Sequence, residues 1–119
     1  MKQLEHDLHR SVAEFLNVAL PPDVYWTTIG HGGFPLSQAL AGRMKARGLK
    51  AGVPDILLVV NGQARFIELK IEGGYLSPAQ KCTIEQLACA GASVEICRSI
   101  LDVQETLIAW GVTLRARAA

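Results

Sequence analysis

The sequence predicts an α/β domain built on a mixed sheet with helices around it. Two observations lead to this prediction. Segments with apolar residues at helical spacing alternate with short runs rich in β-branched and aromatic residues. Two of these strand-like runs are joined by Asn61-Gly62, the strongest short-range signal for a two-residue hairpin loop. The order helix, strand, hairpin, helix, strand, helix indicates two or three layers around the sheet.

The N-terminal third of the chain predicts a long helix followed by a strand. Residues 2–19 carry an apolar stripe, and Pro21-Pro22 ends the helix. The stripe consists of Leu4, Leu8, Val12, Phe15 and Ala19. Residues 24–29 then have the composition of a strand. The glycine-rich residues 30–35 predict a flexible loop, and residues 36–48 predict a short helix that this loop allows to move.

Residues 52–70 predict a hairpin whose register brings charged side chains together. With Asn61-Gly62 as the loop, Val60 pairs with Gln63, and the same register places Asp55 opposite Glu68. Lys70 follows Glu68 by two residues and shares its face. Because directly opposed like charges destabilise a sheet, we expect a cation between the carboxylates, and Mg²⁺ fits best.

Purely structural roles for these three charged residues are the alternative to a functional site. Asp55 has the residue type of a strand entry, and Glu68 and Lys70 have the types of a solvated stripe on an edge strand. A bulge in either strand would also separate the acids. The register favours the functional interpretation, because it links the three residues by geometry.

The C-terminal half predicts a helix, a strand and a second helix. Ser77 has the residue type of an N-cap and Pro78 suits the first turn, so the first of these helices begins there and runs to Gly91. Residues 93–97 predict the strand, and residues 100–110 predict the last helix. Residues 112–117 form a tail whose structure the sequence leaves open.

Composition indicates a compact domain and excludes some functional classes. With 119 residues, of which 50% are hydrophobic, the chain is long enough for one core and short for two, so residues 1–119 are expected to form one domain. We find no pattern of a signal peptide and no apolar run near the ~18 residues of a membrane span, which predicts a cytoplasmic protein without a membrane partner. A net charge of +1 argues against binding polyanions with the whole surface.

The cysteines predict neither a disulfide framework nor a zinc site. Cys82, Cys89 and Cys97 are odd in number and lack a Cys-x-x-Cys spacing. We expect all three to be small core residues in a reducing compartment.

A local basic patch precedes the hairpin. Arg43, Lys45, Arg47 and Lys50 lie close together with no acid among them. They can be phosphate contacts beside the acidic cluster, or the solvated end of a helix and its loop. The residues alone do not separate these alternatives.

These motifs together resemble a known nuclease family. Pro54-Asp55 followed by Glu68-Leu69-Lys70 resembles the PD-(D/E)XK signature, which implies a restriction-endonuclease-like core of order α-β-β-β-α-β. More narrowly, the chain resembles the VRR-NUC (virus-type replication-repair nuclease) family, and the likeness covers nearly the whole sequence. It rests on the segments EHDLHRSVAEFL, HGG, GVPDILLV, FIELK, YLSPAQ and AGASVEIC.

The resemblance implies roles for particular residues. Asp55 and Glu68 would bind Mg²⁺, for which Mn²⁺ would substitute, with the Leu69 backbone carbonyl as a further ligand. Glu5 would complete the metal site from the first helix, directly or through water. Lys70 would position the attacking water, and Gln80 would contact the site or the scissile phosphate. The residues themselves favour Glu5 over Glu14, because Glu5 borders the apolar stripe and Glu14 lies on the polar face.

Other positions depart from the family or keep open roles. His9 stands where the family's first helix carries a glutamine, and a partly buried structural histidine is the simpler interpretation. Ile84 stands where some related nucleases have a tyrosine. His31, in the glycine-rich loop, would contact nucleic acid or cap a turn.

The resemblance implies a metal-dependent deoxyribonuclease. The expected activity is a structure-specific endonuclease on branched DNA such as Holliday junctions or flaps, in a bacterial or phage-infected cell. A homodimer would place two sites on one junction. Alternatives are an exonuclease or single-strand nuclease with the same site, an inactive DNA-binding module, or an α/β interaction protein whose charged cluster is coincidental.

Overall fold

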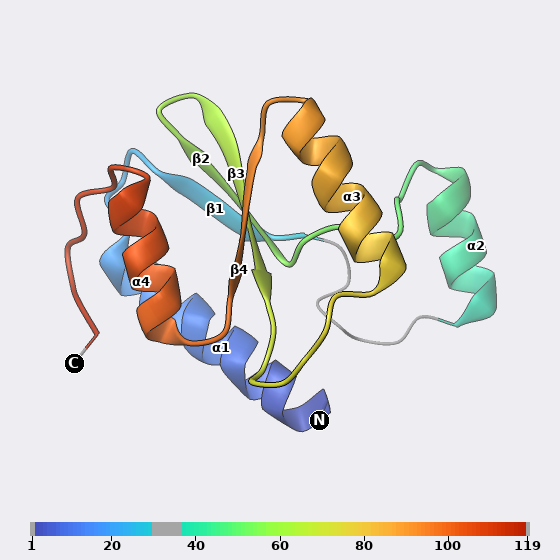
Figure 1. Ribbon diagram of the computed structural model, residues 1–119, viewed down its shortest axis with the longest axis horizontal. Helices are drawn as coiled ribbons and strands as arrows, with labels where there is room; N and C mark the ends of the chain where they lie inside the picture. The colour runs from blue at the N-terminus through green and yellow to red at the C-terminus, as the bar shows by residue number, and fades with distance from the viewer. Residues whose placement is uncertain (1, 30–36, 119) are drawn as a thin grey trace.

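The computed structural model describes residues 2–29 and 37–118, which form helices on both sides of one sheet (Figure 1). The elements are α1 (Lys2–Ala19), β1 (Tyr25–Thr28), α2 (Gln38–Ala46), β2 (Ile56–Val60), β3 (Gln63–Leu69), α3 (Pro78–Cys89), β4 (Ser93–Cys97) and α4 (Ile100–Ala109). The strand order is β1-β2-β3-β4; β4 is parallel to β3, whereas the other neighbours are antiparallel. The predicted mixed sheet and element order are confirmed.

The hairpin has the predicted loop and register. Asn61 and Gly62 have φ angles of 51° and 77°, and a type I′ turn needs positive φ at both positions. Val60 pairs with Gln63, and the ladder continues without a bulge to the pair of Ile56 with Ile67. The alternation of side chains along both strands therefore runs unbroken toward the acidic residues.

Helices α1 and α4 cover one face of the sheet, and the core lies between that face and the two helices. Of the α1 stripe, Val12, Phe15 and Ala19 are buried, Leu8 is half-buried and Leu4 in the first turn is exposed. Fully buried side chains from both helices and from the central strands include Val12, Leu16, Ile56, Leu58, Ile67, Val103 and Leu107. The tail after α4 is irregular, and it is held to α1 by a bond from the Arg115 amide to the Ala19 carbonyl, 2.8 Å.

Helix α3 lies on the other side of the sheet and buries none of its residues completely (Figure 1). Its cysteines, Cys82 and Cys89, are exposed, and Cys97 on β4 is buried. The prediction that all three cysteines are core residues is therefore wrong for two of them. The reason is that α3 packs beside the edge strand β4 and leaves most of its surface in solvent.

Helix α2 stands beyond α3 and buries none of its residues (Figure 1). The link from α2 to β2 is fastened to α3, because Thr83 Oγ1 donates a 2.8 Å bond to the Ala51 carbonyl. Gly52 has φ +76°, and a Cβ atom there would lie 2.4 Å from the Ala79 carbonyl oxygen. The segment that leads into Asp55 is thus held against the start of α3. No helix within the described ranges is long and apolar enough to cross a membrane.

Candidate active site

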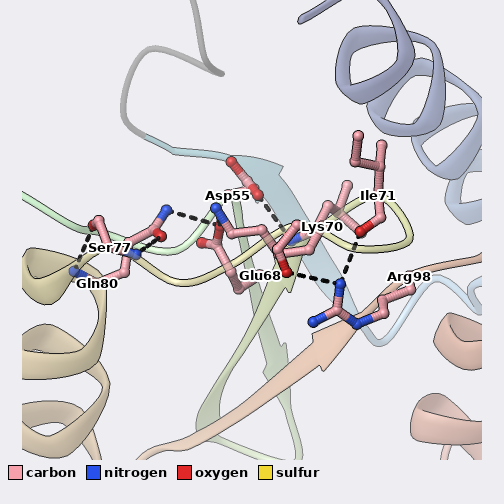
Figure 2. A network of polar contacts seen from close by, with 9 residues as sticks. Asp55, Glu68, Lys70, Ile71, Ser77, Gln80 and Arg98 are labelled. Carbon is pink, nitrogen blue, oxygen red and sulfur yellow. Dashed lines mark hydrogen bonds and ion pairs between the residues drawn. The ribbon is translucent and has the colours of Figure 1, made fainter. Parts of the chain in front are cut away.

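The hairpin brings Asp55 and Glu68 together as its register predicts. Ile67 and Leu69 point into the core, so the alternation turns Glu68 to the α3 side of the sheet. Asp55 immediately precedes β2 and shares that side, and its Oδ2 accepts a 2.8 Å hydrogen bond from the Leu69 amide (Figure 2). This bond fixes the Asp55 carboxylate next to the end of β3.

Lys70 joins the two acids as the first residue after β3. Its Nζ lies 3.7 Å from Glu68 Oε2, and both side chains are largely withdrawn from solvent, at 13% and 3% exposure. The Lys70 amide donates to the Cys97 carbonyl at 3.0 Å, which continues the β3–β4 pairing by one residue. The predicted cluster of Asp55, Glu68 and Lys70 is therefore present on one face.

Gln80 connects the cluster to the first turn of α3. Ser77 and Gln80 form a capping box, in which Ser77 Oγ accepts from the Gln80 amide and Gln80 Oε1 accepts from the Ser77 amide. The same Gln80 side chain donates from Nε2 to Glu68 Oε2 at 3.1 Å (Figure 2). One amide group thus caps the helix and orients a carboxylate of the candidate site.

The environment of Glu68 strongly favours its protonated form. Burial, followed by the charge of Asp55 and the hydrogen bond to it, raises the pKa of Glu68 from 4.5 to about 8, although Lys70 acts in the opposite direction. A cation bound between the two carboxylates would counter both causes, because its positive charge favours the ionised form of Glu68. Lys70 therefore does not fully compensate the negative charge of the two carboxylates.

These donors fit a hard divalent cation. Asp55 Oδ2 and Glu68 Oε2 bond to nitrogen atoms, and each carboxyl keeps a second oxygen that can bind a metal. Mg²⁺ is commonly held by one or two carboxylates and several waters. Within residues 2–29 and 37–118 no group of three or more His, Cys, Asp or Glu side chains forms a metal site, so a protein-only cage of the zinc type is not present there.

The structure does not bring Glu5 into this network. Glu5 is exposed in the first turn of α1. One turn further along, His9 is half-buried, and its Nε2 lies 3.0 Å from Thr28 Oγ1. Thr28 pairs with Ile56, the neighbour of Asp55, so α1 passes beside the strands that carry the site.

The basic patch is exposed but separate from the acidic cluster. Its residues, Arg43, Lys45, Arg47 and Lys50, lie on α2 and the segment that follows it. No hydrogen bond or ion pair links their side chains to Asp55, Glu68 or Lys70 in the part of the chain that the structure describes. His31 lies outside the described residues.

Arg98 is a structural partner of the site that sequence reasoning missed. It follows β4, and its Nη1 donates to the carbonyls of Ile71 and Gly74 at 2.8 and 3.0 Å (Figure 2). These bonds hold the turn that connects Lys70 to Ser77. No local sequence signal indicates this contact, because the arginine lies 27 residues from Ile71 in the chain.

Comparisons with known proteins agree on one family. Residues 6–100 match the family described as the VRR-NUC domain. A solved structure described as a VRR_NUC domain protein has a TM-score of 0.73 at 23% identity, over 90% of this chain and 87% of that chain. A second, described as a VRR_NUC domain, has a TM-score of 0.59 at 21% identity, over 89% and 95%. At these identities the two structures establish the fold alone, and no curated protein matches the chain.

Proposed function

Because this chain belongs to the VRR-NUC domain family, whose fold class is the PD-(D/E)XK nucleases and whose activity is of the nuclease type, we propose that it is a Mg²⁺-dependent deoxyribonuclease. The observation that carries the proposal is the contact of two carboxyls, those of half-buried Asp55 and buried Glu68, beside Lys70. A structural ion pair would need only one acid for this lysine. The second acid is explained by a divalent cation.

Each residue has a proposed part in phosphodiester hydrolysis. Asp55 and Glu68 would hold the ion, with the Leu69 carbonyl as a further ligand and Glu5 acting through water. When bound, Mg²⁺ or Mn²⁺ would lower the pKa of a coordinated water and polarise the phosphate. Lys70 then orients that water and stabilises the negative charge that develops on the phosphate. Gln80 holds the Glu68 carboxylate in place through its 3.1 Å bond.

The proposed substrate is DNA with a branched or otherwise non-duplex structure. The exposed basic residues Arg43, Lys45, Arg47 and Lys50 would bind phosphates of one arm, which accounts for a basic patch in a chain of net charge +1. His31, which lies outside the described residues, would add a further contact to the DNA. A homodimer would let two sites act on the two strands of a junction, and its mass in solution can be measured by light scattering.

The proposal is tested by a cleavage assay on the purified full chain. Plasmid, single strands, flaps and four-way junctions are incubated with Mg²⁺, with Mn²⁺ or with a chelator. We expect cleavage with either metal, strongest on flaps or junctions, and none with the chelator. The Asp55→Ala variant is expected to lose activity by several orders of magnitude, because it removes one of the two carboxylates that would bind and position the ion.

Asp23→Ala is the matched control, since Asp23 is an exposed acid in the turn before β1. It should cleave at the wild-type rate. Activity that persists in the chelator, or in Asp55→Ala, would remove the proposed site. Cleavage confined to single strands and free ends would instead select the exonuclease or single-strand alternative.

A further inference from the structure

The connection between Lys70 and Gln80 is a fixed structure and carries an exposed aromatic ring. It begins with a β-turn in which the Gly74 amide donates to the Ile71 carbonyl at 3.0 Å. Gly73 has φ +81°, which suits the third position of a type II turn. Tyr75 follows this turn directly, and Ser77 caps α3 two residues later.

The side chain of Arg98, which follows β4, holds this turn in place. Its guanidinium bonds to the carbonyls of both Ile71 and Gly74, and its own backbone amide donates to Asp102 Oδ2 at 2.8 Å. A planar guanidinium that bridges two carbonyls fixes their relative position more firmly than a single bond does. Figure 2 shows the two bonds from Arg98 to this turn. The backbone before Tyr75 is therefore tied through Arg98 to the start of α4 as well as to β3.

Tyr75 is the most exposed large hydrophobic side chain in the described part of the protein, at 89%. Two residues of chain span at most about 7 Å, so Tyr75 lies close to Ser77, whose amide bonds to Gln80 Oε1. Gln80 in turn contacts Glu68. At a rise of about 3.4 Å per nucleotide along a DNA strand, about 7 Å corresponds to two nucleotides. The ring is thus placed on fixed backbone within reach of the nucleotides next to the site.

We propose that Tyr75, on the turn that Arg98 holds, is a stacking platform for one unpaired nucleobase next to the scissile phosphate. Bases in a continuous duplex stack on one another and do not offer a free face, whereas unpaired bases stack on aromatic side chains. The platform therefore makes the site prefer strands with unpaired nucleotides. This inference deepens the proposed function and rests on it.

The test measures DNA binding by full-length protein in a Lys70→Met background with Mg²⁺ present, where the expected slowing of cleavage keeps the DNA largely uncut during the measurement. The two probes are a single-stranded oligonucleotide and the fully paired duplex of the same sequence. Tyr75→Ala is expected to weaken binding of the single strand by about 5- to 150-fold and of the duplex by less than about twofold. Tyr75→Phe keeps the ring and should restore binding of the single strand.

Two further variants separate stacking from a general effect. Tyr25→Ala removes another exposed tyrosine, 63% exposed, at the opposite end of the hairpin, and should bind both probes like the parent. Arg98→Met removes the hold on the turn and should weaken single-strand binding selectively. A 2-aminopurine base scanned along the single strand should be quenched at one position, and Tyr75→Ala should abolish that quenching.

Equal losses for both probes, no loss, or failure of phenylalanine to restore binding would each overturn the platform. Circular dichroism of each variant verifies folding, which the exposure of both tyrosines favours. The two proposals fail separately. Wild-type protein that cleaves with Mg²⁺ while Tyr75→Ala shows no selective loss refutes the platform alone. Selective stacking in a protein that cleaves no DNA refutes the nuclease function alone.

Discussion

Replacing Lys70 with methionine is expected to lower the single-turnover cleavage rate by about 10²–10⁴-fold while leaving metal binding in place. Methionine keeps an unbranched side chain but removes the ammonium group that lies 3.7 Å from Glu68 Oε2. The carboxylates that would hold the ion remain. The measurement is the cleavage rate with enzyme in excess over DNA at saturating Mg²⁺, so that product release does not mask the chemical step.

Lys45→Met makes the same substitution in the exposed basic patch and separates binding from chemistry. It is expected to raise KM and to reduce the salt dependence of DNA binding, with kcat unchanged, because phosphate contacts outside the site add binding without acting on the reaction. If the Lys70→Met enzyme keeps its single-turnover rate, or shows only a higher KM, Lys70 is a phosphate contact and does not take part in the reaction.

The Glu68→Gln variant is expected to be more stable than the wild type at pH 8 when no divalent metal is present. Between pH 4.5 and about 8 the folded protein keeps a proton on Glu68 that the unfolded chain has released. Folding then takes up a proton, so the free energy of unfolding falls as pH rises, by about 1.4 kcal/mol for each pH unit in this window. Glutamine resembles the protonated acid and removes this loss.

Urea unfolding in a chelator gives the free energy of unfolding of both proteins at pH 5.5 and at pH 8. Because both proteins contain the same histidines, the contribution of histidine titration cancels in the difference between them. We expect the advantage of Glu68→Gln over the wild type to be much larger at pH 8 than at pH 5.5, because most of the window lies between these two values. Saturating Mg²⁺ should reverse the order at pH 8, because the metal binds the ionised Glu68 and stabilises only the wild type. Parallel pH dependence of the two proteins in the chelator would contradict a paired, withdrawn Glu68.

The parts of the site that depend on local rules were predictable from the sequence. Asn61-Gly62 permits positive φ at two successive positions, which sets the loop, and the loop sets the register that joins Asp55 to Glu68. Ser77-Pro78 likewise marks the start of α3 through its capping chemistry. The bounds of the four predicted helices and of the strands predicted at 24–29 and 93–97 agree with the structure to within two residues at each end.

The parts that depend on tertiary packing were not predictable from the residues alone. The bond from Gln80 to Glu68 requires the position of α3 relative to the sheet, and only family resemblance indicated Gln80. Arg98 directly follows β4 and lies 27 residues from Ile71 in the chain, so no spacing rule connects it to the turn. The exposure of Cys82 and Cys89 follows from the shallow packing of α3, which residue type does not reveal.

The central claim is that Asp55 and Glu68 together bind a divalent ion, and Mn²⁺ binding at pH 8, followed by electron paramagnetic resonance, tests it most directly. The Asp55→Asn/Glu68→Gln double variant is compared with Glu85→Gln/Glu105→Gln, which makes the same change in net charge at exposed positions on α3 and α4. We predict that the wild type and the exposed double variant bind Mn²⁺, and that the site double variant leaves it free. Equal binding by all three proteins would contradict the account.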